Sequence, residues 1–232
     1  MRARTAVLLF SALGAACGGG ATAGGGAGGQ RAPYPAGTAL AVSGEPIPAA
    51  LVEAAAQRVA EVYPERAASF HTTTALESFV LPRAALAQAH AEARAAARAA
   101  CDAARERIRA GESAEALGAA ELTGTWAQLS LLVWDAARRL EPGEWSEPLE
   151  GPGHFALVRL ERRGGFEHFP AEEALTVRVL EFGYLPAGDA GPAWDAALGA
   201  ARLEVVDPAY EELVPETLRY KMKGPKERRS TP

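Results

Sequence analysis

The sequence predicts an α+β protein with a helical module and a small, mostly antiparallel sheet. Between residues 48 and 110, apolar side chains recur at three-to-four spacing and alanine, arginine and glutamate dominate, which is typical of helices. Between residues 145 and 185, apolar and polar side chains alternate in short stretches separated by Pro-Gly turns, which is typical of strands. The chain is long enough for one or two domains with cores of their own.

The helical half begins with a short strand and a helix. In the stretch ALAVSGEPIPAALVEAAAQRVAEVY, Leu40 and Val42 alternate with small residues, and Gly44 permits a turn. Pro48 marks the start of the helix, where its missing N–H group costs nothing. Pro64 is expected to end this helix.

A second helical block is expected from about Thr74 to Ala110. Pro82 predicts a kink, because proline removes one hydrogen bond from a helix interior. The alanine-rich composition after Ala84 has a very high helix propensity. Gly111 then suits the left-handed position that ends many helices.

Shorter elements are expected in the second half. We predict helices at residues 114–117, 129–140 and 193–202, strands at 145–149, 155–160, 175–185 and 203–207, and a tight turn at 151–153. Pro208 is expected to end the last strand.

The first residues have the layout of a secretory signal peptide. Arg2 and Arg4 precede a short apolar run at 7–13, and small residues then lead to Cys17. The run is too short to span a bilayer, which takes about 20 residues. Small residues followed by cysteine resemble a bacterial lipobox, which implies that Cys17 is acylated and becomes the first residue. An ordinary signal peptide with an incidental cysteine is the alternative.

The segment after Cys17 supports a lipid anchor, because GGGATAGGGAGGQRAPYPAG has nothing to bury and is typical of a flexible tether. Gly18, rather than aspartate, follows the cysteine, which in such lipoproteins implies delivery to the outer membrane, facing the periplasm. Two or three acyl chains would make attachment effectively permanent.

Composition argues against several functions. The formal net charge is −5, and basic residues gather only in the tail KMKGPKERR, so we expect no nucleic-acid partner. The histidines lack metal-ligand spacing, so neither a metal nor a cofactor is expected; they are His71, His90, His154 and His168. If Cys17 is acylated, Cys101 is a lone thiol that must be buried in a helix face.

Several stretches point to one family. AVSGEPIPAALVEAA reads as an opening strand and helix, and ALESFVLPRAALAQ as the helix that follows. AARERIRAGESAEALGA and DAARRLEPGEWSEPLEGPGHFALVRLERR combine a helix, a Leu-Glu-Pro-Gly-Glu phrase and a strand. Together they resemble SurA- or PrsA-like periplasmic foldases, which contain parvulin-type (PpiC) peptidyl-prolyl cis-trans isomerase domains.

The resemblance implies a domain organisation. We expect a signal peptide at 1–16, a lipidated glycine-rich tether at 17–38, a helical foldase-like module at 39–102, a reduced parvulin-like domain at 103–163, C-terminal strands and a helix that complete the sheet or module at 164–214, and a basic tail at 215–232.

The family's catalytic histidines are not matched. The strand that carries the first is absent, and Ala156 occupies the place of the second. His154 lies two residues earlier, on the same face of an extended strand, and is the candidate catalytic residue. The three apolar pocket positions of the family fall on Leu129, Val133 and Arg138, and the candidates for substrate binding are Leu129, Val133 and Phe155.

A later segment could replace the family strand that carries the first histidine, which is missing from this sequence. Residues 176–185 resemble it in length and pattern but follow the last parvulin strand. We predict that they pair beside residues 155–160, because a vacant slot would leave an unpaired edge. Glu181 or Phe182 would then stand where the family has its histidine.

These observations favour a membrane-tethered, parvulin-like foldase or chaperone that binds unfolded or proline-containing segments of exported proteins without strong catalysis. Two alternatives stay open: an active peptidyl-prolyl isomerase that uses His154, and a non-catalytic structural or assembly lipoprotein that grips one partner.

Overall fold

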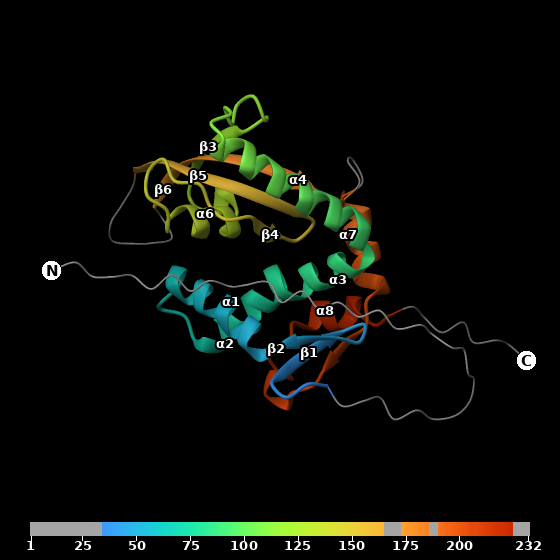
Figure 1. Ribbon diagram of the computed structural model, residues 1–232. Coiled ribbons are helices and arrows are strands. Elements are labelled where there is room, and N and C mark those ends of the chain that lie inside the picture. Colours follow the sequence, from blue (N-terminus) through green and yellow to red (C-terminus); the bar gives the residue numbers. More distant parts are fainter. Residues whose placement is uncertain (1–33, 165–172, 186–189, 225–232) are drawn as a thin grey trace, which may run out of the picture. The chain divides into compact units, whose positions relative to one another are not determined.

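The computed structural model describes residues 34–164, 173–185 and 190–224 (Figure 1). The predicted signal peptide, Cys17 and most of the predicted tether lie outside these residues. Helices and antiparallel sheets are both present, which confirms the α+β class. Within the described part of the chain, no helix is long and apolar enough to cross a membrane.

The described strands form two antiparallel sheets. The three-stranded sheet has the order β2-β1-β7, with β1 at Thr38–Val42, β2 at Glu45–Pro48 and β7 at Leu203–Val205. The four-stranded sheet has the order β3-β6-β5-β4, with β3 at Ala120–Gly124, β4 at Leu149–Gly151, β5 at His154–Gly164 and β6 at Ala174–Gly183.

Helices connect and cover these sheets. The α-helices are α1 (Ala49–Val62), α2 (Ala68–Ala75), α3 (Leu81–Ala89), α4 (Ala91–Arg109), α5 (Trp126–Leu129), α6 (Leu131–Ala137), α7 (Ala190–Ala200) and α8 (Glu216–Lys221). A π-helical turn, η1, spans Leu76–Val80, and a 3₁₀ turn, η3, spans Pro208–Tyr210.

The long helical block is more divided than the sequence predicts. It begins at Ala68, before the expected Thr74. A kink is predicted at Pro82, and the structure has a π-helical turn just before it. There the N–H group of Leu81 donates to the carbonyl oxygen of Leu76, five residues back. An unpredicted break follows at His90, whose φ of −128° and ψ of 38° separate α3 from α4. The left-handed conformation predicted for Gly111 is present, with φ +94°.

The predicted pairing of the two main strands is confirmed. β5 and β6 pair antiparallel, with Phe155 opposite Phe182 and Leu160 opposite Val177. The two faces of this sheet are buried against different helices, because successive side chains of a strand point to opposite sides. Ala156, Val158 and Leu160 share a core cluster with α6, and Phe155 and Leu157 share another with α4.

Several short predicted elements are wrong or displaced. Residues 114–117 form turns rather than a helix: the N–H groups of Leu117 and Gly118 bond carbonyls three residues back, and that of Ala119 bonds the carbonyl of Ala114, five residues back. The predicted helix 129–140 is split at Ser130, whose φ of +68° is incompatible with helix. The predicted strand 145–149 is displaced. Trp145 makes only an isolated bridge to Arg159, and the continuous strand, β4, begins at Leu149.

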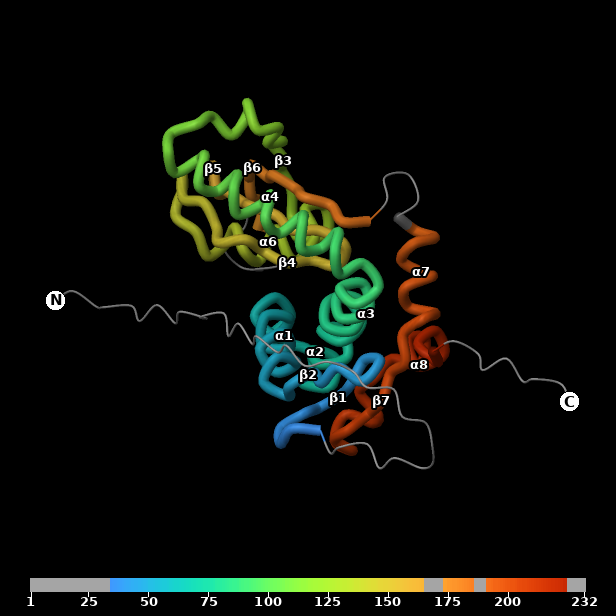
Figure 2. Tube along the Cα trace, turned by 45° about the vertical axis from the view of Figure 1, so that its right-hand side comes forward, coloured from blue at the N-terminus to red at the C-terminus, as the bar shows by residue number. Residues whose placement is uncertain are grey.

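The three-stranded sheet joins the two ends of the described chain. β7 pairs with β1 although the two lie far apart in the sequence (Figure 2). The predicted basic tail begins as a folded element: α8 buries Leu218 and the following turn buries Met222, which is 1% exposed, in the core beneath this sheet. Earlier in the chain, α4 runs unbroken through residues 102 and 103, the predicted boundary between two domains.

Candidate functional site

The predicted substrate-binding residues do not line one open slot. Leu129 and Val133 are 6% and 3% exposed in the core between α6 and the four-stranded sheet. Phe155 is 1% exposed in the other core cluster, on the α4 side of the same sheet. Leu129 and Val133, on α5 and α6, cover one face of the sheet, and the alternation of β5 places Phe155 on the other face.

His154, the candidate catalytic residue, opens β5 opposite Gly183. Its Nδ1 atom lies 3.3 Å from the carbonyl oxygen of Pro152, its one hydrogen-bond partner within the described residues. Glu181 is exposed opposite Ala156. No hydrogen bond or ion pair joins His154 to a carboxylate in that part of the chain, so the arrangement does not recreate a catalytic pair.

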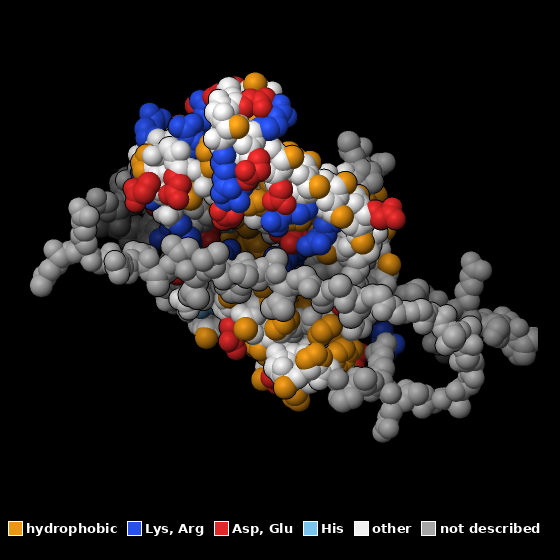
Figure 3. All heavy atoms as spheres, in the orientation of Figure 1, with side chains coloured by type: hydrophobic (Ala, Val, Ile, Leu, Met, Phe, Trp, Pro, Cys, Tyr) orange, Lys and Arg blue, Asp and Glu red, His pale blue; other side chains and the backbone are white. Residues whose placement is uncertain are grey.

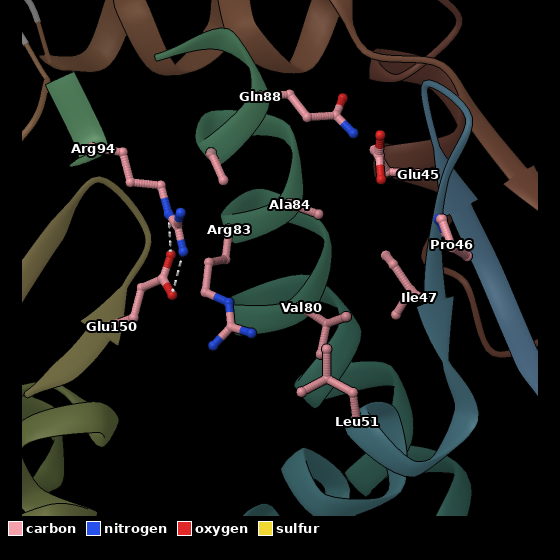
Figure 4. Close-up of a pocket in the computed structure, with 11 residues that line it drawn as sticks. Glu45, Pro46, Ile47, Leu51, Val80, Arg83, Ala84, Gln88, Arg94 and Glu150 are labelled. Carbon is pink, nitrogen blue, oxygen red and sulfur yellow. Dashed lines mark hydrogen bonds and ion pairs between the residues drawn. The ribbon is translucent and has the colours of Figure 1, made fainter. Parts of the chain in front are cut away.

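A different region contains an open hollow. A hollow of about 270 Å³ lies between β2, the start of α1, the helix α3 and the first turn of α4 (Figure 4). We call it the β2–α3 groove. Its lining comprises Glu45, Pro46, Ile47, Leu51, Val80, Arg83, Ala84, Ala87, Gln88, Arg94 and Glu150.

The centre of the β2–α3 groove is apolar. Ile47 and Leu51 come from β2 and α1, and Val80 and Ala84 come from the facing helix (Figure 4). Leu51 is 38% exposed, which is unusual among the large apolar side chains that the structure describes. Hydrophobic side chains also gather where β1 and β2 lie on the face shown in Figure 3, whereas charged side chains crowd over α4.

The groove is wide at its centre because the helical wall carries small side chains. Alanine occupies positions 84 and 87, one turn apart on α3, so this wall adds little volume. Gln88 fixes the wall in place, since its Nε2 atom donates a hydrogen bond of 2.6 Å to the carbonyl oxygen of Val42 on β1.

A two-bond ion pair closes one side of the groove. The Nε and Nη2 atoms of Arg94 lie 2.6 and 2.9 Å from the two carboxylate oxygens of Glu150 (Figure 4). The guanidinium also lies 5.7 Å from the centre of the Phe155 ring. The hydrogen bond to Glu150 raises the pKa of Arg94, so this cation stays charged.

Two further charges flank the apolar centre. Arg83 and Glu45 line the groove, and neither side chain forms an ion pair with any residue that the structure describes. An extended segment in the groove would therefore meet apolar side chains at the centre and one unpaired charge of each sign near them.

The backbone edge beside the groove is protected. β2 is the outer strand of its sheet, and its Pro46 and Pro48 have no N–H group to donate. Such prolines discourage open-ended strand pairing. A segment lying in the groove would therefore contact side chains more than it would add a strand to the sheet.

The groove was not predicted from the sequence, because Leu51 fits the apolar stripe of the first helix. In the sequence, Leu51 recurs at helical spacing with Val52, Val59 and Val62, as a buried residue would. The structure buries the three valines and leaves Leu51 outside. A helix turns by about 100° per residue, which places Leu51 only about 20° from Val62 around the helix axis, so the apolar pattern alone does not distinguish it from the valines.

The described residues contain no candidate metal centre. No three histidine, cysteine, aspartate or glutamate side chains there are grouped in a way that could hold a metal ion. No protein-family model, curated protein or solved structure matches the chain.

Proposed function

We propose that this chain is a membrane-tethered, parvulin-like foldase or chaperone, facing the periplasm, that holds unfolded or proline-containing segments of exported proteins without strong catalysis. The observation that carries the proposal is the β2–α3 groove: an open, apolar-centred hollow with Leu51 exposed inside it. An apolar groove with charged margins suits transient contact with many extended segments, because apolar contact is not directional.

Weak catalysis is supported by what surrounds the predicted site. An isomerase must seat the proline ring in a dry slot and stabilise the twisted amide with polar groups. Leu129 and Val133 lie in a closed core, and the ring of His154 hydrogen-bonds only a backbone carbonyl among the described residues. Binding a segment without isomerising its X-Pro bonds requires neither a dry proline slot nor a pair of catalytic side chains.

The decisive test compares two variants, one with a new carboxylate inside the β2–α3 groove and one with a new carboxylate elsewhere on the surface. Leu51→Asp puts a carboxylate in the apolar centre, while Leu122→Asp changes an equally exposed leucine (41% against 38%) on β3. The assay follows light scattering of several unrelated unfolded clients mixed with the full chain. We expect the unaltered protein and Leu122→Asp to suppress aggregation, and Leu51→Asp to lose most of this activity.

Equal suppression by Leu51→Asp and the unaltered protein would overturn the groove as the client site. Both leucines are partly exposed, so circular dichroism should show that both variants fold. A single tight partner in a pull-down, without suppression for unrelated clients, would favour the assembly lipoprotein instead.

Two further measurements address the remaining parts of the proposal. Unaided X-Pro isomerisation takes tens of seconds or more, and we expect the chain to leave this rate nearly unchanged in a coupled peptide assay. Turnover that His154→Ala abolishes would show an active isomerase. For the anchor, Cys17→Ser should release the protein into the soluble periplasmic fraction, and retention at the membrane would contradict lipidation of Cys17.

A further inference from the structure

A second hollow lies beside β7, the outer strand of the three-stranded sheet on the side opposite β2. It measures about 320 Å³ and is bounded by β7 and by α8 with its following turn. Its lining joins three cations, Arg202, Arg219 and Lys223, to three apolar side chains, Leu203, Val205 and Met222. No carboxylate contributes to this lining, although the sequence as a whole carries a net charge of −5.

Two of the cations are held side by side by the backbone. Arg202 and Lys223 form an isolated antiparallel bridge, flanked by hydrogen bonds from Leu203 to Met222 (2.9 Å) and from Gly224 to Ala201 (2.8 Å). This is the non-hydrogen-bonded kind of pair, in which the side chains stand closest, about 4.5 Å apart at Cα. Like charges placed directly opposite one another are destabilising.

The structure supplies little to neutralise this pair. Within the described residues neither side chain forms an ion pair, and the Lys223 ammonium lies 4.6 Å from the centre of the Tyr220 ring, a contact that leaves its charge intact. The third cation, Arg219, is paired with Glu211. Glu204 alternates with Leu203 and Val205 along β7 and so points to the other face of the strand.

We propose that this hollow is a binding site for a phosphate group. A phosphate carries close to two negative charges and three acceptor oxygens, which match three neighbouring donors better than the single charge of a carboxylate. Arginine presents its N–H groups in a fork that fits phosphate oxygens, and both Arg202 and Lys223 are exposed enough to move toward a ligand. Binding would relieve the repulsion that the bridge imposes.

The phosphate has two possible sources. The partly buried Leu203 and Val205 would accommodate an apolar part of a ligand, as in a phospholipid headgroup region, and the exposed Tyr220 (74%) has the amphipathic ring favoured at membrane surfaces. A soluble phosphate ester would use the cations alone. The proposal requires neither the lipid anchor nor the function assigned to the β2–α3 groove.

The test uses the full chain carrying Cys17→Ser, so that the predicted anchor does not contribute. Inorganic phosphate and monomeric dihexanoylphosphatidic acid, whose headgroup is a phosphate monoester, are titrated separately, with binding measured by calorimetry and by the thermal unfolding midpoint. The Arg202→Ala/Lys223→Ala double variant is compared with Arg66→Ala/Arg107→Ala, which removes two exposed arginines elsewhere and so loses the same charge. We expect the first pair to weaken binding at least tenfold and the control to change it less than twofold.

A second expectation follows from the like-charge bridge. In buffer without phosphate, Lys223→Ala should raise the unfolding midpoint, and added ligand should raise the midpoint of the unaltered chain but not that of the double variant. Binding of the phospholipid alone would identify a lipid source, and equal binding of both probes would identify free phosphate. Absence of binding by either probe, or equal weakening in the two double variants, would overturn the proposal.

Discussion

Cys101 should be nearly inert in the folded protein, and the size of this effect follows from its surroundings. The thiol lies on α4, is 0% exposed, and packs in the cluster that contains Phe155 and Leu157. Burial raises its pKa from 9.0 to about 11. Because the reactive species is the thiolate, a raised pKa slows every reaction that begins with nucleophilic attack by sulfur.

The ionisation effect alone can be worked out. At pH 8 a thiol of pKa about 11 is ionised in roughly one molecule per thousand, whereas an exposed thiol of pKa 9.0 is ionised in roughly one per ten. The folded chain should therefore react about 100-fold more slowly than the unfolded chain, and exclusion of the reagent by packing slows it further. The raised pKa also means that Cys101 favours folding below pH 9.0 and that this contribution is lost as pH rises toward about 11.

The assay labels the full chain carrying Cys17→Ser with a maleimide at pH 8, with and without denaturant, so that Cys101 is the sole thiol. Rapid labelling in denaturant and slow labelling without it are expected, and Cys101→Ala serves as the blank. If the folded chain labels within fivefold of the unfolded chain, Cys101 is not held in the core as described.

Three further predictions concern stability. Gly111→Ala should lower the free energy of unfolding in urea by about 1–2 kcal/mol, because φ is +94° there, whereas Gly199→Ala in α7 should raise it by up to about 1 kcal/mol. A double-mutant cycle on Arg94 and Glu150 should give a coupling energy of about 1 kcal/mol that falls in high salt, since the arginine is 38% exposed. Burial raises the pKa of Tyr184 above 10.0, so stability should fall as pH rises beyond that value, and Tyr184→Phe should flatten this fall in circular dichroism measurements.

The sequence predicted best those features that a local pattern determines. The pairing of β5 with β6 followed from two strongly alternating stretches, and the burial of Cys101 followed from its place on an alanine-rich helix. Gly111 was predictable because few other residues tolerate a positive φ at a helix end.

The elements that were missed lack such patterns. β3 is exposed at four of its five positions and is held by pairing with β6 alone, so no alternation marks it. β2 carries two prolines, which normally argue against a strand and are tolerated here because β2 is an outer strand. The β2–α3 groove was missed because Leu51, Arg83 and Glu150 converge only after folding.

The predicted isomerase slot and the β2–α3 groove differ in how much the folded core must change to admit a ligand. A slot beside Leu129 and Val133 would have to open where Trp134 is now packed, fully buried, with its Nε1 atom donating a hydrogen bond of 2.8 Å to the carbonyl oxygen of Glu173. Removing a side chain of this size from a core typically costs about 3–5 kcal/mol, a large fraction of the stability of a domain. The groove requires no such opening, because Leu51 is already exposed to solvent. Binding of a client away from the four-stranded sheet therefore costs the chain less than binding within it, which favours the proposed holding function over the proposed isomerase.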